Sequence, residues 1–313
     1  NPMTQEGIAL GRKLFWDPAL SKNNNISCAS CHAPQYAFAD NVAKSTGVHN
    51  QPTVRNSMAL VNLAWNTSFF WDGRVSTLEE QISHPIHDPI EMDMNWATVI
   101  ARIKNDESYG DMFSEAFGNA CVDSTRISYA IAQFIRTMVS ANSKFDQAMY
   151  LGGMPLSPAE YRGLELFLAE GGDPSYYPGG QRGGDCFHCH GGALVQFTDH
   201  LFHNNGLDTV FSDLGREAVT GLAYDRGVFR TPTLRNIALT APYMHDGRFE
   251  TLHDVIAHYN MGGHLSATID PFMKFPVVGL QLTPQDFDDL VAFLHTLTDE
   301  EFVNNPDFKK PEK

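Results

Sequence analysis

The chain has 313 residues, 42% hydrophobic and 19% charged, a balance typical of one large or two medium globular domains. Its formal net charge of −15, from 22 basic and 37 acidic residues, argues against binding to nucleic acid or to an anionic membrane surface. We expect no membrane span, because no run of about 18 apolar residues occurs. The first residues show no signal-peptide pattern, so an exported protein is expected here in its mature form.

Taken in chain order, the strongest periodic patterns are helical. They predict helices over residues 96–117, 124–141, 158–170 and 284–297. The third is introduced by Ser157 as an N-cap, with a proline next and a glutamate three positions after the cap, and it stops at Gly171-Gly172. Strand-like alternation is scarce, so the sequence predicts a mostly α fold with long loops.

Four of the five cysteines form two copies of a C-x-x-C-H motif. The copies comprise Cys28, Cys31 and His32, and Cys186, Cys189 and His190. In c-type cytochromes the two thiols of this motif form thioethers with haem and the histidine binds iron. The alternatives are a zinc site or a redox dithiol, but zinc needs no histidine after each pair and a dithiol favours a βαβ context. The sequence therefore predicts two covalent haem c groups, and it leaves Cys121, which we expect to be small and buried.

Two further segments also occur twice. Pro-Thr-x-Arg-Asn spans residues 52–56 and 232–236, and x-Asp-Gly-Arg spans 71–74 and 245–248. Since one haem motif precedes each copy, we expect two related cytochrome c-like haem domains. The division predicted from the sequence is 1–150 and 151–313, with the boundary between residues 142 and 157.

The repeat exposes an asymmetry between the two domains. Aligning the copies on Asp-Gly-Arg places Tyr259 of the second domain opposite Pro85 of the first. Proline offers no donor atom to iron, whereas tyrosine does. The alignment thus predicts one haem iron bound by two protein ligands and one open to a small molecule. The alternative for Tyr259 is an ordinary core tyrosine on an amphipathic helix.

Polar residues flank the position that lacks a ligand. Gln81 precedes Pro85 by four residues, and Glu91 follows it by six. Reaction of peroxide at a haem requires moving a proton between its oxygens, which a carboxylate does, while an amide holds an oxygen by a hydrogen bond. The alternative is that both residues are solvated surface side chains.

The chain resembles the bacterial di-haem cytochrome c peroxidase and MauG family over most of its length. The similar segments are GIALGRKLFWDPALS, PTVRN, FFWDGR, LEEQ with its following Pro and Glu, TPTLRN and PYMHDGR. The resemblance implies that His32 is the proximal ligand of a peroxidatic haem. It implies that Gln81, Pro85 and Glu91 line the distal pocket, with Glu91 as the acid–base group.

The same resemblance assigns further residues. It implies that His190 is the proximal ligand of the second haem and that Trp71 lies between the haems as a stepping stone for electrons. It also implies a Ca²⁺ site formed by the side chain of Asn56 and the carbonyls of Thr240 and Pro242, oxygen donors that suit this cation.

Members of the family differ in the residue that they have at the position of Tyr259. Many of its peroxidases have methionine fourteen residues after the histidine of His-Asp-Gly, whereas MauG has tyrosine, as here. Methionine raises the potential of a haem, while a phenolate favours oxidised iron. Met261 is an alternative ligand of the iron. His258 and His264 are expected either at the surface or next to a ligand without binding the iron themselves.

Two groups of residues keep open alternatives. His49 either binds the first iron in a resting state, as a loop histidine does in some family members, or is an ordinary loop residue. Five arginines of the repeated motifs pair either with haem propionates or with neighbouring aspartates; they are Arg55, Arg74, Arg230, Arg235 and Arg248.

The resulting hypothesis is a periplasmic di-haem c enzyme that uses hydrogen peroxide to form high-valent iron and oxidises a partner protein. Its target is expected to be tryptophan or another aromatic side chain, reached by long-range electron transfer. The first alternative is a detoxifying cytochrome c peroxidase that takes electrons from a small cytochrome c or a cupredoxin. The second is a non-catalytic di-haem electron-transfer cytochrome.

Overall fold

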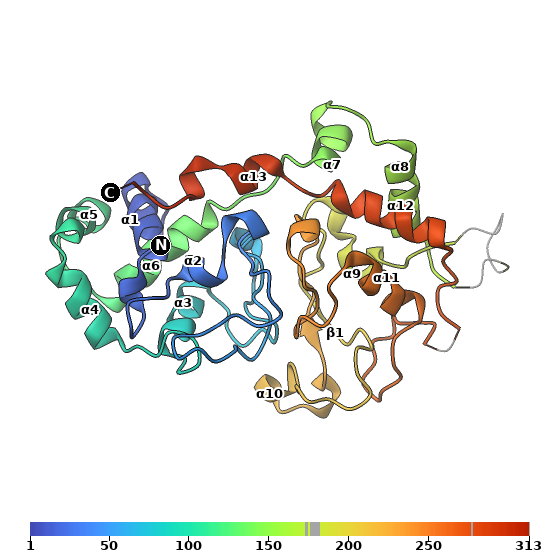
Figure 1. Ribbon diagram of the computed structural model, residues 1–313, viewed down its shortest axis with the longest axis horizontal. Coiled ribbons are helices and arrows are strands. Elements are labelled where there is room, and N and C mark those ends of the chain that lie inside the picture. Colours follow the sequence, from blue (N-terminus) through green and yellow to red (C-terminus); the bar gives the residue numbers. More distant parts are fainter. Residues whose placement is uncertain (173–174, 176–181, 277, 313) are drawn as a thin grey trace. The chain divides into compact units, whose positions relative to one another are not determined.

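The computed structural model describes residues 1–172, 175, 182–276 and 278–312, and this part of the chain is mostly helical, as predicted (Figure 1). It divides into two compact units. Unit 1 comprises Asn1–Phe69, Val75–Val139 and Glu301–Lys313, and unit 2 comprises Phe70–Arg74 and Ser140–Glu300.

The units differ from the division at residue 150 in three places. Unit 2 begins at Ser140, ten residues before that boundary. The C-terminal segment belongs to unit 1, because the rings of Phe302 and Phe308 pack edge-on against Phe38. The segment Phe70–Arg74 belongs to unit 2, where the carbonyl of Trp71 accepts a hydrogen bond of 2.7 Å from the backbone N–H of Arg230.

Unit 1 is built around the pair of helices α1 and α6. Its helices are α1 (Gln5–Phe15), α2 (Cys28–Cys31), α3 (Leu78–His87), α4 (Trp96–Asn105), α5 (Glu107–Phe117), α6 (Ser124–Arg136) and most of α13 (Glu300–Asn304). Short 3₁₀ turns cover Pro18–Leu20, Pro34–Tyr36, Leu63–Trp65 and Pro306–Phe308. The C-terminal tail lies beside α1, where the guanidinium of Arg12 donates to the carbonyls of Pro306 and Lys309 at 2.7 Å (Figure 1).

Unit 2 is built around α8 and α12. Its helices are α7 (Lys144–Asp146), α8 (Pro158–Leu168), α9 (Phe187–His190), α10 (Glu217–Thr220), α11 (Leu252–Asn260) and α12 (Pro284–His295). A π-helical turn covers Gln147–Leu151, and 3₁₀ turns cover Gly192–Leu194, Ala223–Asp225 and Ile237–Leu239. Two short antiparallel strands, β1 (Phe202–His203) and β2 (Phe229–Arg230), pair Phe202 with Arg230.

The predicted helices are present with shorter bounds. The 96–117 pattern forms two helices, α4 and α5, because the backbone of Asp106 is extended and its carboxylate caps α5 by accepting from the N–H of Ser108 at 2.9 Å. The Ser157 capping box starts α8 as expected. A further short helix, α13, follows α12.

The sequence repeat is also a structural repeat. Each copy forms a tight turn closed by an antiparallel bridge, Phe69 to Val75 in one and Tyr243 to Phe249 in the other. A threonine N-cap then starts α3 in unit 1 and α11 in unit 2. Pro85 and Tyr259 are both the eighth residue of these helices. The alignment that places them opposite each other therefore holds in three dimensions.

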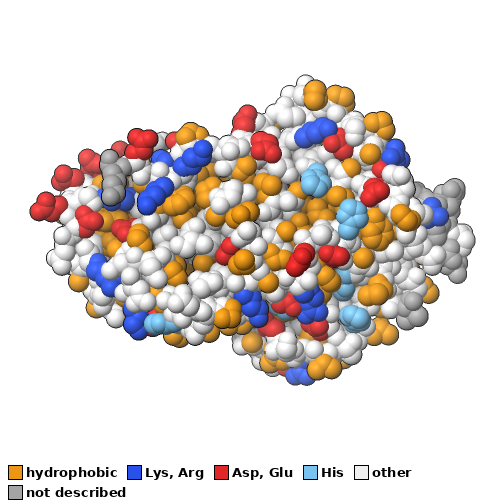
Figure 2. Space-filling view, viewed as in Figure 1, with side chains coloured by type: hydrophobic (Ala, Val, Ile, Leu, Met, Phe, Trp, Pro, Cys, Tyr) orange, Lys and Arg blue, Asp and Glu red, His pale blue; other side chains and the backbone are white. Residues whose placement is uncertain are grey.

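Acidic side chains gather on part of the surface, and acidic, basic and apolar side chains are interspersed elsewhere (Figure 2). Figure 2 shows acidic side chains over the part of unit 1 that carries α5, where Glu107, Asp111 and Glu115 are exposed. In the described part of the chain, every helix is too short or too polar to cross a lipid bilayer.

Candidate functional site

A cavity in unit 1 brings together the residues that the sequence assigned to the first haem. The empty space within it is about 660 Å³, including open solvent at its mouth. The lining includes Cys28, Cys31 and His32 with Gln81, Pro85 and Glu91, and apolar side chains such as Phe15, Ile82 and Ile135. The walls are therefore mostly apolar, with a few polar groups.

His32 is oriented by the backbone. Its Nδ1–H donates to the carbonyl of Phe38 at 2.7 Å, and the same carbonyl accepts from the N–H of Leu60 at 3.3 Å. This bond selects the tautomer in which Nε2 is the lone-pair nitrogen, the arrangement that metal-binding histidines use. Burial lowers the pKa of His32, which favours the neutral, ligating form.

Glu91 enters the cavity from the loop after α3. Its carbonyl accepts from the N–H of Val48 at 2.8 Å, which ties this loop to the Thr46–Gly47 segment that also lines the cavity. Burial raises the pKa of the Cys28 thiol to about 12, and the Glu91 carboxylate adds to that rise, so the carboxylate lies close to the attachment motif. Gln81 and Pro85 reach the same cavity from α3.

The second C-x-x-C-H motif repeats this arrangement in unit 2. The Nδ1–H of His190 donates to the carbonyl of Phe197 at 3.1 Å, and that carbonyl also accepts from the N–H of Leu234 at 3.2 Å. Leu234 is the equivalent of Leu60 when the two copies are aligned on Asp-Gly-Arg. Phe197 and Phe38 both have left-handed backbone conformations, with φ of 53° and 59°, and both are completely buried. Burial lowers the pKa of His190 as well.

Tyr259 projects from α11 toward the second motif. Its ring packs against the apolar core of unit 2 together with Cys186 and Phe187. Burial raises the pKa of the Tyr259 phenol to about 12, and the side-chain amide of Asn205, which donates to its Oη at 3.2 Å, opposes that rise. The thiols of Cys186 and Cys189 are near enough to act on the same pKa. Tyr259 and the second attachment motif therefore share one apolar region of unit 2.

The alternative ligands near Tyr259 have different positions. Met261 is the C-cap of α11 and is 58% exposed, so much of it faces solvent. His258 is only 4% exposed, and its Nε2–H donates to the backbone carbonyl of Asn205 at 3.0 Å. His258 is thus a buried neighbour of Tyr259 that bonds the same asparagine, which is one of the two kinds of position expected for it. The residue that sequence reasoning missed is Asn205, which no motif marks.

The remaining predicted residues fall in several places. Trp71 is partly buried in unit 2. Asn56, in unit 1, donates through its amide nitrogen to the carbonyls of Val42 and Ala43, at 3.1 and 3.3 Å, so its oxygen is the atom it would offer to a cation. Thr240 and Pro242 belong to unit 2, and the calcium site stays a prediction.

His49 and Cys121 lie at the surface. The Nε2 of His49 is 2.8 Å from a carboxylate oxygen of Asp93, so the two side chains are joined by a hydrogen bond in this conformation. Cys121 is exposed, and the expectation of a buried thiol is wrong. It precedes α6 on a loop, where its sulfur lies 3.8 Å from Asp123.

Three of the five arginines pair with carboxylates. Arg74 bonds Asp72, Arg248 bonds Asp246 and Asp208, and Arg235 bonds Asp146. For Arg55 and Arg230, pairing with a propionate stays a prediction. Arg230 is 5% exposed, and burial lowers its pKa to about 10, which makes an anionic partner at this position favourable.

The donor sets fit a covalently attached haem at both motifs. Each offers two thiols next to a histidine whose Nδ1 is hydrogen-bonded, and the first lies in a largely apolar cavity. The two sites differ at one repeated helix position, which is Pro85 in the lining of the first and Tyr259 in the second. Two related units with these features define a di-haem c-type protein.

Comparisons with known proteins agree with this class. A family model described as di-haem cytochrome c peroxidase matches residues 5–153. A methylamine utilization protein MauG of Methylorubrum extorquens is 36% identical over 95% of this chain and 79% of its own length. A cytochrome c551 peroxidase of Nitrosomonas europaea is 33% identical over 99% of this chain and 84% of its own length.

Solved structures give the same result. A MauG-like protein associated with microbial copper homeostasis superimposes with a TM-score of 0.88 at 35% identity, covering 99% of this chain and 94% of the other. The diheme peroxidase BthA of Burkholderia thailandensis superimposes with a TM-score of 0.80 at 25% identity, covering 100% and 91%. The chain belongs to the di-haem cytochrome c peroxidase and MauG family. It is a peroxide-dependent oxidoreductase with two haem c groups.

Proposed function

We propose that this enzyme oxidises an aromatic side chain, in particular tryptophan, of a partner protein, and that it uses hydrogen peroxide as the oxidant. Each peroxide takes up two electrons and two protons and leaves as two waters. The two electrons come from the partner's side chain, by long-range transfer. The observation that supports this proposal is that Tyr259 packs against the same apolar core as Cys186, at the helix position that Pro85 holds in the other copy of the repeat.

The first site supports peroxide chemistry. When bound, the two haems supply the irons at which peroxide is reduced and oxidising equivalents are held. His32 and His190 would bind these irons through Nε2. Glu91 would move a proton from one peroxide oxygen to the other, and Gln81 would hold the peroxide by a hydrogen bond. Pro85 offers no ligand atom, which leaves this side of the cavity to the substrate.

The second site supports the choice of a protein substrate. A phenolate ligand favours oxidised iron, whereas a methionine ligand raises the potential and favours uptake of electrons from a small donor. Tyr259 therefore suits retention of oxidising equivalents better than rapid entry of electrons from a cytochrome. Trp71 would serve as a stepping stone between the two sites.

The remaining parts of the proposal follow the family resemblance. Asn56, Thr240 and Pro242 would hold a structural Ca²⁺ through oxygen atoms. A periplasmic location suits covalent haem attachment. The partner has an oxidisable aromatic side chain; a relative named for methylamine utilization and a similar structure associated with copper homeostasis indicate that such partners differ between family members.

A second candidate is a detoxifying peroxidase that takes electrons from a small cytochrome c or a cupredoxin. It is favoured by the 33% identity to a cytochrome c551 peroxidase, close to the 36% identity to MauG.

Steady-state oxidation of a reduced small cytochrome c separates the two functions. For a protein-oxidising enzyme we expect slow turnover in the wild type and faster turnover, with a higher potential of the second haem, in Tyr259→Met. Met261→Leu, a change at the exposed C-cap of the same helix, is the control and should alter neither quantity. Rapid wild-type turnover that Tyr259→Met leaves unchanged would exclude the proposal in favour of the detoxifying peroxidase.

A further inference from the structure

A methionine sulfur lies beside the Tyr259 phenol. The side-chain nitrogen of Asn205 is 3.2 Å from the Oη of Tyr259 and 3.5 Å from the Sδ of Met244. One amide group therefore contacts two atoms that are both able to bind haem iron. Met244 directly precedes the His-Asp-Gly-Arg segment, fifteen residues before Tyr259, so sequence spacing gives no reason to pair them.

Asn205 is fixed to the helix that carries Tyr259. Its backbone carbonyl accepts from the Nε2–H of His258, at 3.0 Å, and the next carbonyl, that of Gly206, accepts from the N–H of His264 at 2.7 Å. His258 is 4% exposed, so this bond is shielded from water. The backbone of Asn205 is thus held against α11, and from there its side-chain amide reaches both the oxygen and the sulfur.

The repeat shows that the sulfur is a feature of unit 2. Met244 has a left-handed backbone with φ of 75°, and its equivalent in the other copy, Phe70, has φ of 65°. The unusual conformation therefore belongs to the turn in both copies. The side chains differ, because the ring of Phe70 lies 3.5 Å below the guanidinium of Arg74, whereas Met244 directs its thioether to Asn205.

We propose that Met244 is a reserve axial ligand of the second haem iron, and that Asn205 selects between it and Tyr259. The amide N–H stabilises the phenolate oxygen by a hydrogen bond and holds the thioether beside it. When the phenol is lost, the flexible methionine side chain binds the iron instead. This inference rests on Tyr259 being the resting ligand, which is part of the proposed function.

The test compares Tyr259→Phe with the double variant Tyr259→Phe/Met244→Leu, both as holoproteins with equal haem content and circular dichroism. In Tyr259→Phe we expect the second haem to stay low-spin by electron paramagnetic resonance, to gain the far-red methionine-to-ferric-iron absorption band and to have a raised potential. In the double variant the low-spin signal and the band should be lost. Tyr259→Phe/Met261→Leu is the matched control and should behave as Tyr259→Phe.

The outcomes distinguish this inference from the proposed function. If Tyr259→Phe is high-spin whether or not Met244 is present, Met244 is not a ligand, while Tyr259 remains one. If Tyr259→Phe leaves the second haem unchanged, Tyr259 is not the ligand and both proposals fail. For Asn205 the variant is Asn205→Leu, in which part of the population should show the methionine band; its complete absence would overturn the selecting role.

Discussion

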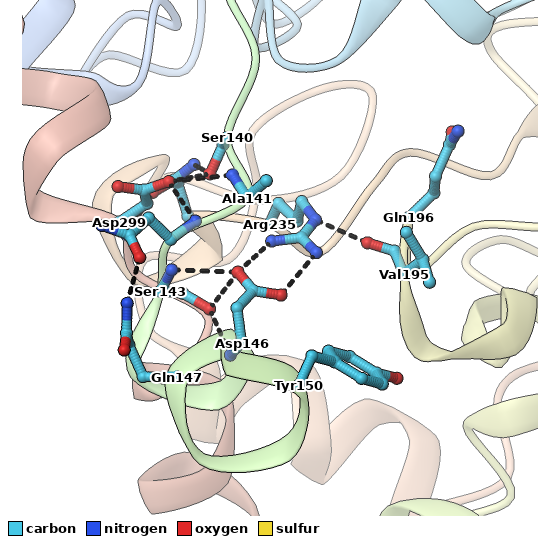
Figure 3. Close-up of polar contacts among 12 residues, drawn as sticks. Ser140, Ala141, Ser143, Asp146, Gln147, Tyr150, Val195, Gln196, Arg235 and Asp299 are labelled. Atoms are coloured by element: carbon cyan, nitrogen blue, oxygen red, sulfur yellow. Dashed lines mark hydrogen bonds and ion pairs between the residues drawn. The ribbon is translucent and has the colours of Figure 1, made fainter. Parts of the chain in front are cut away.

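The guanidinium of Arg235 and the carboxylate of Asp146 form a two-pronged ion pair, with both N–O distances at 2.8 Å, and their side chains are 2% and 5% exposed (Figure 3). The Nε of Arg235 also donates to the carbonyl of Val195 at 2.6 Å. Val195 is two residues from Phe197, whose carbonyl orients His190. The pair therefore connects the segment before α8 to the loop that orients His190.

Replacing Asp146 by asparagine should strongly destabilise unit 2. The change leaves a buried guanidinium without its counter-charge, and breaking a buried pair in this way costs about 3–5 kcal/mol. We expect that loss in the free energy of unfolding, measured by denaturant titration of the holoprotein.

The matched control is Glu217→Gln. Glu217 and Arg226 form an equally two-pronged pair in unit 2, with N–O distances of 2.5 and 2.8 Å, but the arginine is 49% exposed. Because exposed pairs are screened by solvent, its removal should have a much smaller effect. Equal losses in the two variants would mean that burial of the Asp146 pair is not what makes it important.

Glu91→Gln should slow the reaction with hydrogen peroxide by roughly 10²-fold or more, because an amide does not accept and return a proton. Stopped-flow absorption in a single turnover measures this rate. Glu115→Gln, at an exposed site on α5, should react like the wild type. An unchanged rate in Glu91→Gln would remove this carboxylate from the acid–base role.

Gly47→Ala tests the backbone that positions Glu91. A Cβ at Gly47 would lie 1.6 Å from the carbonyl oxygen of Ile90, so the Ile90–Glu91 backbone has to move. A displaced carboxylate should slow the peroxide reaction in the same assay, even though no chemical group is removed.

Its control is Gly110→Ala. A Cβ at Gly110, inside α5, meets no atom within 4 Å, so this variant should keep the wild-type rate and gain up to about 1 kcal/mol of helix stability. If Gly47→Ala also reacts at the wild-type rate, the close approach of the two segments does not position Glu91.

Glu79 should contribute to the acid sensitivity of unit 1. Burial of the Glu79 carboxyl acts to raise its pKa. Hydrogen bonds from Arg136, at 2.7 and 2.8 Å, outweigh this effect and lower the pKa of Glu79 to about 2. In the unfolded chain this pKa is about 4.3. The unfolded state therefore binds the proton first as the pH falls, and the stabilisation by Glu79, complete above about pH 4.3, is lost progressively toward about pH 2.

Glu79→Gln should thus flatten the fall in unfolding free energy between about pH 4 and pH 2.5 relative to wild type. Denaturant titrations at several pH values measure this slope. The neighbouring, exposed Glu80 provides the control Glu80→Gln, which should keep the wild-type slope. An unaltered slope in Glu79→Gln would contradict the assignment.

Local motifs accounted for much of the first site. The attachment motif needs only four to five adjacent residues, so Cys28, Cys31 and His32 could be identified without a fold. Gln81, Pro85 and Glu91 were assigned to the same site through the repeat and the family resemblance, and the structure brings all six to one cavity. The roles of the last three stay predictions.

The amino-acid sequence alone was sufficient to identify the haem motifs, the repeat and the correspondence of Tyr259 to Pro85. Each of these features consists of residues that are close together in the chain or separated by a constant offset. Folding decided the features that depend on distant segments meeting: the partner of Arg235, the exposure of Met261 and the approach of Met244 and Asn205 to Tyr259. Such contacts arise from packing among loops of irregular conformation, and no periodic pattern of side chains encodes which loop residues will touch.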